Sequence, residues 1–340
     1  MKSALITGVT GFAGRHLAEL LVKKGVKVSG TFRSRSNISG LRELGVDLVE
    51  CDLRDAHSTQ NVFRGYIEPP FEVVFHLAAD TFVPASFTAP CETFNTNVLG
   101  TLNLLEAIRK HSDGTRIVNA GSSEQYGLVH ENELPITEET PFRPLSPYAV
   151  SKIAQEDVCK QYARSYGLDV VLARSFNYLG PGGNDRTVVP AFCKQIAEVE
   201  SGKRDVVLHG NLSARRDFVD VRDAVRAYFL LATQASNEDV FNICTGNAVS
   251  MEDLLGQLLS LSPDPNVEAE VDVSRMRPSD VPVLKGSFHK LRAATGWMPT
   301  YRLTQSLEDT LNYWRQQVNP HAVCEEEKFQ AKVESWGPDA

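Results

Sequence analysis

The stretch that decides the fold is residues 8–14, which read Gly-Val-Thr-Gly-Phe-Ala-Gly. It follows an apolar, β-type run at Ala4–Thr7 and opens a segment with helical spacing, Phe12–Lys24. Between a strand and a helix, such glycines allow a tight turn, close approach of the backbone to a pyrophosphate and close helix–strand packing. The phosphates would lie at the helix N-terminus, where unpaired N–H groups favour an anion. The stretch therefore predicts a dinucleotide-binding turn.

The first half of the chain continues this alternation. β-Branched runs predict strands, and the amphipathic stretches between them predict helices. We expect strands at Ala4–Thr7, Val26–Thr31, Val46–Cys51, Val73–Leu77, Arg116–Ala120 and Val170–Arg174, and helices at Phe12–Lys24, Leu41–Leu44, Ala56–Tyr66, Asn95–Lys110 and Pro147–Tyr166. This order predicts an α/β fold of the Rossmann type, a doubly wound parallel sheet with helices on both faces.

The regular alternation of strands and helices ends after residue 176, where a Gly/Asn/Pro-rich loop begins. Further helices are expected at Val189–Glu200 and Val219–Ala232, and strands at Asp205–His209, Val240–Cys244 and near 267–273. We therefore predict a Rossmann domain over 1–176, to which 217–247 returns, a smaller interleaved α/β substrate-binding lobe of 177–216 and 248–318, and a peripheral tail at 319–340.

Composition narrows the function classes. The 340-residue chain has a formal net charge of −8, whereas binding of nucleic acid needs a basic surface, so we expect no nucleic-acid partner. No signal peptide and no apolar run of ~20 residues is evident, so we expect no membrane partner. The six cysteines are scattered without a CxxC pair, which predicts reduced cysteines in a cytoplasmic protein and no metal site.

The end of the second strand bears on the choice of cofactor. Residues 30–35 read Gly-Thr-Phe-Arg-Ser-Arg, with two arginines and no acid. A carboxylate here would bond the ribose of NAD, whereas arginine accommodates the 2′-phosphate of NADP. Solvated loop arginines are the alternative, but we predict NADP(H). The expected cofactor-binding residues are Gly8, Gly11, Phe12, Ala13, Gly14, Arg33, Ser34, Arg35, Asp52, Leu53, Ala78, Ala79, Asn97, Tyr148 and Lys152.

Residues 146–152 read Ser-Pro-Tyr-Ala-Val-Ser-Lys and carry the candidate acid and base. The serine and proline predict a helix start, and Tyr148 and Lys152, four residues apart, share a helix face. An adjacent ammonium favours the phenolate, so we expect the pKa of Tyr148 to fall below its reference value of about 10. This pair suits proton transfer to or from a sugar hydroxyl or ketone.

The strand at Arg116–Ala120 runs into residues 121–127, Gly-Ser-Ser-Glu-Gln-Tyr-Gly. Ligands bind at the carboxyl ends of strands in open α/β sheets. Ser122 is therefore expected to hydrogen-bond the reacting oxygen. Glu124, at the same edge, could act as a base or hold sugar hydroxyls.

Together, the glycine turn, Ser122, Tyr148 and Lys152 resemble the extended short-chain dehydrogenase/reductase family, also called the NAD-dependent epimerase/dehydratase family. Within it the chain is similar to the branch acting on GDP-sugars, with GDP-mannose 4,6-dehydratases and GDP-6-deoxy-4-keto-hexose reductases. The similarity covers residues 3 to about 316. Its more specific markers are residues 122–127 and three further segments: Arg-Ser-Phe-Asn at 174–177, Arg-Asp-Phe at 216–218 and Arg-Pro-Ser-Asp-Val-Pro at 277–282.

This resemblance implies a GDP-sugar substrate and a homodimer formed through the helices at 95–110 and 147–166. It also implies substrate-binding residues. Asn177 and Glu124 would contact the sugar, Arg216 and Arg277 the diphosphate, Asp280 a ribose hydroxyl, and the helix bearing Lys194 the base.

Two reactions stay open. A reductase would use NADPH and Tyr148 to reduce a 4-keto group, of the GDP-4-keto-6-deoxymannose to GDP-rhamnose type. A GDP-mannose 4,6-dehydratase needs a base as well, which Glu124 could supply. The short segment from Arg33 to Val46 favours the reductase, although Tyr178 stands where a histidine is expected in that branch. A third hypothesis is a non-catalytic regulator that senses NADP. Such proteins generally lose the Tyr/Lys pair, whereas this chain keeps Ser122, Tyr148 and Lys152, which argues against this hypothesis.

Overall fold

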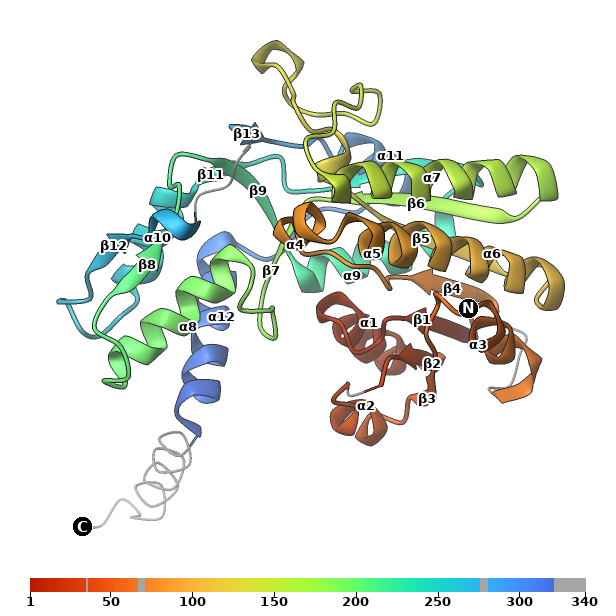
Figure 1. The fold of residues 1–340 in the computed structure, drawn as a ribbon, viewed down its shortest axis with the longest axis horizontal. Coiled ribbons are helices and arrows are strands. Elements are labelled where there is room, and N and C mark those ends of the chain that lie inside the picture. The colour runs from red at the N-terminus through yellow and green to blue at the C-terminus, as the bar shows by residue number, and fades with distance from the viewer. Residues whose placement is uncertain (35, 67–70, 276–280, 321–340) are drawn as a thin grey trace. The chain divides into compact units, whose positions relative to one another are not determined.

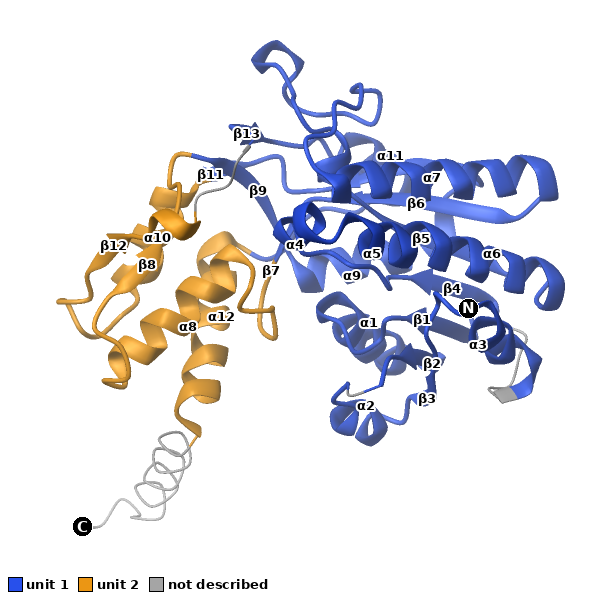
Figure 2. Ribbon diagram, in the orientation of Figure 1, with its two compact units in different colours: residues 1–178, 214–249, 277–301 blue, residues 179–213, 250–276, 302–340 orange. Residues whose placement is uncertain are grey.

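The computed structural model describes residues 1–34, 36–66, 71–275 and 281–320. The chain forms two compact units (Figure 2). The larger comprises residues 1–178, 214–249 and 277–301, and the smaller comprises 179–213, 250–276 and 302–340. The larger unit thus includes 277–301, which the sequence analysis assigned to the smaller lobe, because a strand and a helix from that stretch pack on the larger unit's own elements.

The core of the larger unit is a parallel sheet (Figure 1). Among the described residues it has seven strands in the order β10-β6-β5-β4-β1-β2-β3. Their bounds are β1 Ser3–Thr7, β2 Lys27–Phe32, β3 Asp47–Glu50, β4 Val73–His76, β5 Arg116–Ser122, β6 Asp169–Ser175 and β10 Val240–Ile243. The strand order reverses between β1 and β4, which is where open sheets of this kind bind nucleotides.

Helices and shorter turns connect these strands. In the larger unit they are α1 Phe12–Lys23, α2 Ser39–Glu43, α3 Ala56–Asn61, η1 Val62–Tyr66, α4 Val83–Thr88, α5 Pro90–Phe94, η2 Asn95–Leu99, α6 Gly100–His111, η3 Ser123–Gln125, η4 Glu131–Glu133, α7 Pro147–Tyr166, α9 Val221–Gln234 and α11 His289–Thr295.

Both faces of the sheet are buried. Side chains alternate along each strand, so Ala4 and Ile6 pack with residues of α1 and α9, whereas Leu5 and Val74 pack with residues of η1, α6 and α7. The α/β, Rossmann-type fold predicted from the sequence is confirmed. Because the helices cover both faces, the carboxyl edge of the sheet is left to carry the site.

Helix α7 begins and ends where its sequence dictates. The Ser146 hydroxyl accepts a hydrogen bond from the backbone N–H of Ala149 at 3.1 Å, and Pro147 occupies the first turn. Gly167 ends the helix with φ +71°, a left-handed conformation that glycine adopts without strain. The long helix is fixed at the end that carries Tyr148.

The smaller unit contains α8 Val188–Glu200, β8 Val207–His209, α10 Met251–Ser260, β12 Ala269–Val271, η5 Val273–Arg275 and α12 Leu303–Val318. Helix α8 packs against α12, and Arg315 forms two hydrogen bonds to the Glu200 carboxylate, at 2.7 and 2.8 Å. Strands β8 and β12 pair in parallel. A further small sheet is formed by β7 Asn177–Leu179, β9 Arg215–Asp220, β11 Ala248–Ser250 and β13 Val283–Leu284, of which β9 and β13 belong to the larger unit.

Several boundaries differ from the sequence prediction. Helix α9 begins at Val221 rather than Val219, because residues 215–220 form β9 and the Asp220 side chain caps the helix through the Arg222 N–H at 2.8 Å. Helices α4 and α5 were not predicted, since a proline interrupts the periodicity near each start.

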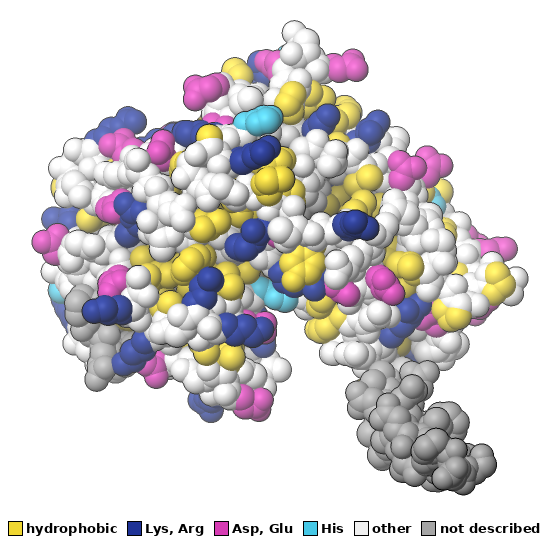
Figure 3. All heavy atoms as spheres, turned by 180° about the vertical axis from the view of Figure 1, so that it is seen from behind, with side chains coloured by type: hydrophobic (Ala, Val, Ile, Leu, Met, Phe, Trp, Pro, Cys, Tyr) yellow, Lys and Arg dark blue, Asp and Glu magenta, His cyan; other side chains and the backbone are white. Residues whose placement is uncertain are grey.

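Among the described residues, none of the helices is both long and apolar enough to span a bilayer. Cys51, Cys159, Cys193 and Cys244 are buried and Cys91 is exposed, all as free thiols, while Cys324 lies outside the described residues. On the face drawn in Figure 3, Lys/Arg and Asp/Glu side chains are interspersed. This differs from the single-sign surface of proteins that bind polyanions.

Candidate active site

The turn between β1 and α1 brings backbone segments so close together that only glycine fits at two of its positions. Gly8 has φ +69°, and a Cβ there would lie 2.9 Å from Cα of Ala78. A Cβ on Gly14 would lie 2.4 Å from the Gly8 carbonyl oxygen. No side chain of the described residues caps α1 at Gly11. A tight glycine turn that leads into an uncapped helix N-terminus fits the pyrophosphate of a dinucleotide.

This close approach makes a prediction for Gly8→Ala. An alanine at φ +69° is strained by about 1–2 kcal/mol and also collides with the Ala78 backbone. We expect the variant to bind NADPH at least about tenfold more weakly, a loss of about 1.4 kcal/mol, measured by fluorescence titration.

The matched control is Gly25→Ala. Gly25 has φ +74° but nothing within 4 Å of its built Cβ, so the variant carries the strain without the collision. It should lose stability and keep its NADPH affinity. Equal loss of affinity in both variants would contradict a role for the close approach.

The other predicted cofactor residues are distributed along the same edge. Phe12 and Ala13 begin α1, partly buried, and Arg33 and Ser34 are exposed after β2, while Arg35 lies outside the described residues. The Asp52 carboxylate pairs with Arg54 at 2.6 Å, and this hydrogen bond lowers the pKa of Asp52. Leu53 is buried, and its carbonyl accepts from Asn103 at 2.7 Å.

Asn97 joins the segment after β4 to α7. It is fully buried, accepts from the Asp80 N–H at 2.7 Å and donates to the Asp80 carbonyl at 3.1 Å. It also donates to the Ser151 hydroxyl at 2.9 Å, and Ser151 donates to the Tyr148 carbonyl at 2.7 Å. Asn97 therefore ties the start of α7 to the loop that follows Ala78 and Ala79.

His76 was missed by sequence reasoning, because a histidine at a strand end carries no pattern of its own. Thr101 gives its only hydroxyl proton to the Asn97 carbonyl at 2.6 Å, so it accepts from Nε2 of His76 at 2.8 Å. Nδ1 of His76 then accepts from Thr7, whose oxygen also accepts the Ala78 N–H at 3.2 Å. Burial and the charge of Lys152 lower the pKa of His76 to about 3. The neutral ring fixes the Thr7 hydroxyl, which in turn holds the Ala78 N–H at the strand end beside Gly8.

The catalytic candidates meet at the carboxyl end of β5. Ser122 ends that strand, and it lies close enough to the phenol of Tyr148, in the first turn of α7, to act on the pKa of that phenol. Lys152, one turn further on and only 3% exposed, donates to the Ala120 carbonyl and to Oε1 of Gln155, both at 2.8 Å. Glu124 lies in the short turn η3, and its charge acts on Tyr148.

Burial sets the protonation of this site. It raises the pKa of Tyr148 above its ordinary value, with the Ser122 hydrogen bond opposing and the charge of Glu124 adding to the rise. Burial also lowers the pKa of Lys152 to about 7. The expectation that the pKa of Tyr148 falls below its ordinary value is therefore wrong for this structure, because burial is the largest influence on the phenol and raises its pKa. The phenol is protonated at neutral pH.

The sequence and the fold match those of a known protein family. Residues 5–310 match the family model described as GDP-mannose 4,6 dehydratase. The chain belongs to this family. The predicted place within the epimerase/dehydratase group is confirmed, and the relatives below are named as enzymes of both reactions that the sequence left open.

Two curated relatives show the range of the family. The chain is 37% identical over 250 residues to GDP-6-deoxy-D-mannose reductase of Pseudomonas aeruginosa, covering 73% of this chain and 81% of the relative. It is 30% identical over 371 residues to GDP-mannose 4,6-dehydratase of Yersinia enterocolitica, covering 98% and 99%. The solved structure of RMD from Pseudomonas aeruginosa complexed with NADPH has a TM-score of 0.81 at 31% identity, covering 94% of this chain and 100% of that one. The cofactor predicted from the sequence is the one held by that relative.

The residues assigned to the substrate by family resemblance are placed as follows. Asn177 begins β7, and its amide donates to the Asp217 carbonyl at 3.4 Å. Arg216 lies on β9, largely buried, and donates to the Val281 carbonyl at 2.6 Å. Lys194, on α8 of the smaller unit, pairs with Asp185 at 2.7 Å. Arg277 and Asp280 lie outside the described residues.

Tyr178, the departure from the family pattern, joins a cluster of hydroxyls. Its phenol donates to Ser175 at 2.6 Å and is hydrogen-bonded to the Tyr228 phenol at 2.8 Å. Burial raises the pKa of Tyr178 well above its ordinary value. A phenol held in this way occupies the position expected for histidine without offering a base near neutral pH.

Proposed function

We propose that the chain reduces the 4-keto group of a GDP-6-deoxy-4-keto-hexose with NADPH, a reaction of the GDP-4-keto-6-deoxymannose to GDP-rhamnose type. The observation that carries the proposal is that Ser122, Tyr148 and Lys152 lie together at the carboxyl end of β5, where Lys152 donates to the Ala120 carbonyl. Two hydroxyl donors at one point suit a carbonyl oxygen that gains negative charge. The 37% identical reductase supports the choice of reaction.

The Gly8–Gly14 turn would hold the pyrophosphate of NADPH, with Arg33 and Arg35 proposed for its 2′-phosphate, and the bound cofactor would supply the hydride that reduces C4, leaving as NADP⁺. The carbonyl π pair moves to the oxygen, which takes the proton of the Tyr148 phenol. Ser122 donates a hydrogen bond to the same oxygen, and the Lys152 ammonium stabilises the phenolate until water returns its proton. The raised pKa of Tyr148 keeps the proton in place for this transfer.

One observation favours a second function, GDP-mannose 4,6-dehydration. Glu124 is a carboxylate close enough to Tyr148 to affect its pKa, and dehydration needs a base for the C5 proton. Dehydration, however, begins by oxidising a C4 hydroxyl, which requires Tyr148 as phenolate. A protonated phenol suits the reductase better, so dehydration ranks second.

Two parallel reactions test the choice. Wild-type protein is incubated with GDP-4-keto-6-deoxymannose and NADPH, and separately with GDP-mannose and NADP⁺. The proposal predicts NADPH oxidation and a 4-hydroxy product in the first reaction only. A 4-keto product from GDP-mannose, without net NADPH formation, would establish the dehydratase instead.

The pKa of Lys152 gives the reaction a pH dependence. Burial places this pKa at about 7, and the active form is the ammonium, which is present below the pKa and lost as pH rises through it. We expect kcat/KM for reduction to fall about tenfold per pH unit above neutrality, as one deprotonation requires. Lys152→Met should be slow and should lack this inflection. An inflection near the ordinary lysine pKa of about 10.4 would contradict the assignment.

The remaining parts of the proposal rest on the family. Asn177, Glu124, Arg216, Arg277, Asp280 and Lys194 are proposed to contact the GDP-sugar. A homodimer through the helices at 95–110 and 147–166 is proposed, and it is supported by an exposed apolar side chain on each: Leu99 at 42% and Val150 at 41% exposure. The cytoplasmic location predicted from the cysteines belongs to the same proposal.

A further inference from the structure

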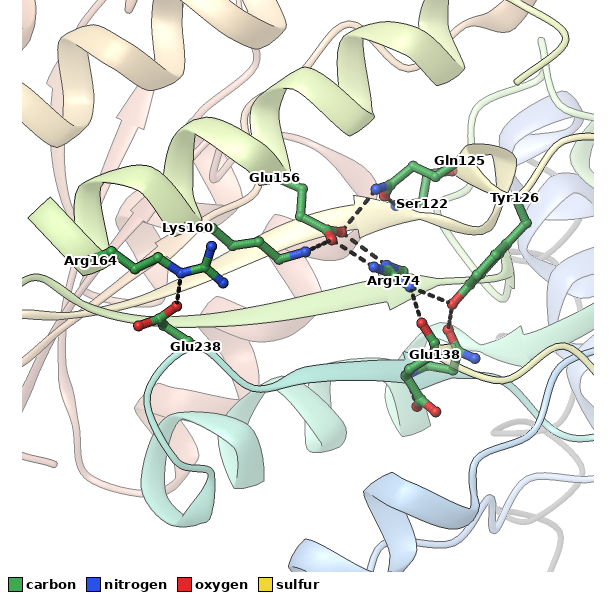
Figure 4. Close-up of polar contacts among 10 residues, drawn as sticks. Ser122, Gln125, Tyr126, Glu138, Glu156, Lys160, Arg164, Arg174 and Glu238 are labelled. Atoms are coloured by element: carbon green, nitrogen blue, oxygen red, sulfur yellow. Dashed lines mark hydrogen bonds and ion pairs between the residues drawn. The ribbon is translucent and has the colours of Figure 1, made fainter. Parts of the chain in front are cut away.

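A buried polar network lies behind Ser122 (Figure 4). Oε1 of Gln125 accepts the backbone N–H of Ser122 at 2.8 Å, while its Nε2 donates to Oε2 of Glu156 at 2.9 Å. Gln125 is 0% exposed and Glu156 is 1% exposed, so water does not compete for these bonds. The single amide thus bridges the end of β5 to α7.

Gly121 has no side chain, and this lets the Gln125 amide lie against its backbone. A Cβ on that residue would lie 2.7 Å from Oε1 of Gln125. Real Cβ contacts are not this short, so any larger residue at 121 would push the amide away from Ser122. The position of the Gln125 amide therefore depends on glycine at residue 121.

Glu156 is held as a carboxylate by two cations. Arg174 on β6 donates from Nε at 2.9 Å and from Nη2 at 2.6 Å, and Lys160 donates at 2.6 Å. Burial opposes the charge of Glu156, but the bonds from Arg174 and Lys160 outweigh it and lower the pKa of Glu156. Beside a carboxylate, the NH₂ end of Gln125 must face Glu156 and its oxygen must face Ser122. The ion pair therefore fixes the orientation of the amide.

Arg174 is itself anchored on its far side. Nη1 donates to the Tyr126 hydroxyl and to the Glu138 carbonyl, both at 2.9 Å, and Tyr126 donates to Oδ1 of Asn242 at 2.6 Å. Its guanidinium carbon lies 4.5 Å from the centre of the Phe142 ring. The ion pair is thus rigidly held within the larger unit.

Tyr148, Lys152 and Glu156 lie one turn apart on α7 and share a face of the helix. We propose that Gln125, fixed by the Glu156–Arg174 ion pair, is a positioning residue. By holding the Ser122 backbone, it keeps the Ser122 hydroxyl correctly placed relative to the Tyr148 phenol. This inference rests on the proposed function only in that Ser122 and Tyr148 act on the substrate oxygen, a role they have in the reductase and the dehydratase alike.

The test is Gln125→Met, which keeps the length of the side chain and removes the amide. We expect kcat to fall about tenfold to a hundredfold, because small misplacements of a reacting group cost this much, while KM for the keto-sugar stays within about twofold. The Ser122 amide proton should exchange faster with D₂O, measured by mass spectrometry with fragmentation. Gly121→Ala displaces the same amide by another route and should give the same pattern if Gln125→Met folds poorly.

The matched control is Arg164→Met. Arg164 lies on the same helix and pairs with Glu238 at 2.7 Å, but it is 68% exposed and has no contact with the Ser122 network (Figure 4). It should keep the wild-type kcat and the wild-type exchange rate at Ser122.

A double-mutant cycle separates positioning from general structure. If Gln125 acts through Ser122, adding Gln125→Met to Ser122→Ala should lower kcat little further. Equal fold losses in both backgrounds, or wild-type kcat in Gln125→Met, would overturn the proposal. Wild-type protein inactive on both sugars would contradict the proposed function instead, and an unchanged exchange rate at Ser122 in Gln125→Met would still overturn the positioning role.

Discussion

Tyr148→Phe should lower kcat for reduction of the keto-sugar at least about a hundredfold, since general acid–base catalysis contributes ~10²–10⁴. The phenylalanine fills the same buried space beside Ser122 but has no proton to give to the carbonyl oxygen. NADPH affinity, measured by fluorescence titration, should change little, because the glycine turn that holds the phosphates is untouched.

The matched control is Tyr166→Phe, at the other end of the same helix. Tyr166 is 51% exposed and lies five turns from the reacting edge, so its variant should keep wild-type kcat. A Tyr148→Phe enzyme that retains more than about a tenth of wild-type kcat would contradict the acid role.

The second large effect is expected on stability. Arg174→Met leaves the buried Glu156 with Lys160 as its remaining cation and removes a donor from Tyr126. Breaking a buried ion pair by removing one partner costs about 3–5 kcal/mol. We expect a loss of this size in the free energy of unfolding, measured by urea denaturation of the purified protein.

Two comparisons sharpen this prediction. Arg164→Met breaks an exposed pair and should cost about 0–1 kcal/mol. Replacing both partners, as in Glu156→Leu with Arg174→Met, should recover part of the loss, because no buried charge is then left unpaired. Equal losses in the two arginine variants would mean that the buried pair is no more important than the exposed one.

The elements that the sequence predicted well are those encoded by local periodicity. The strands at β1 and β4 to β6 and the helix Pro147–Tyr166 lie within two residues of their expected bounds, because burial, capping and chain direction are read from neighbouring residues. Strand β9 was missed because Arg215–Asp220 carries charges at most positions, yet buries them through pairing and capping.

The polar networks of the site could not be predicted in this way. Gln125 and Glu156 are 31 residues apart, and Thr7 and His76 are 69 apart. Such pairs meet only because of the order of strands in the sheet, which no local pattern specifies. The same limit explains the wrong expectation for the pKa of Tyr148, since the degree of burial follows from the assembled fold.

The substrate side of the site was predicted only through family resemblance. Asn177 and Arg216 follow no periodic pattern, and the sequence alone offered no reason to bring them together. In the structure β7 pairs with β9, and the Asn177 amide donates to the carbonyl of the buried Asp217, which follows Arg216 in the chain. Their role in binding the GDP-sugar stays a prediction.

The central claim is net transfer of hydride from NADPH to C4 of a keto-sugar, and isotope labelling tests it most directly. Wild-type protein is incubated with GDP-4-keto-6-deoxymannose and NADPH that is fully deuterated at C4 of the nicotinamide. The product, examined by mass spectrometry and NMR, should carry one deuterium at C4 of the hexose. Recovery of the keto-sugar unchanged and without label, with no oxidation of NADPH, would contradict the proposed function.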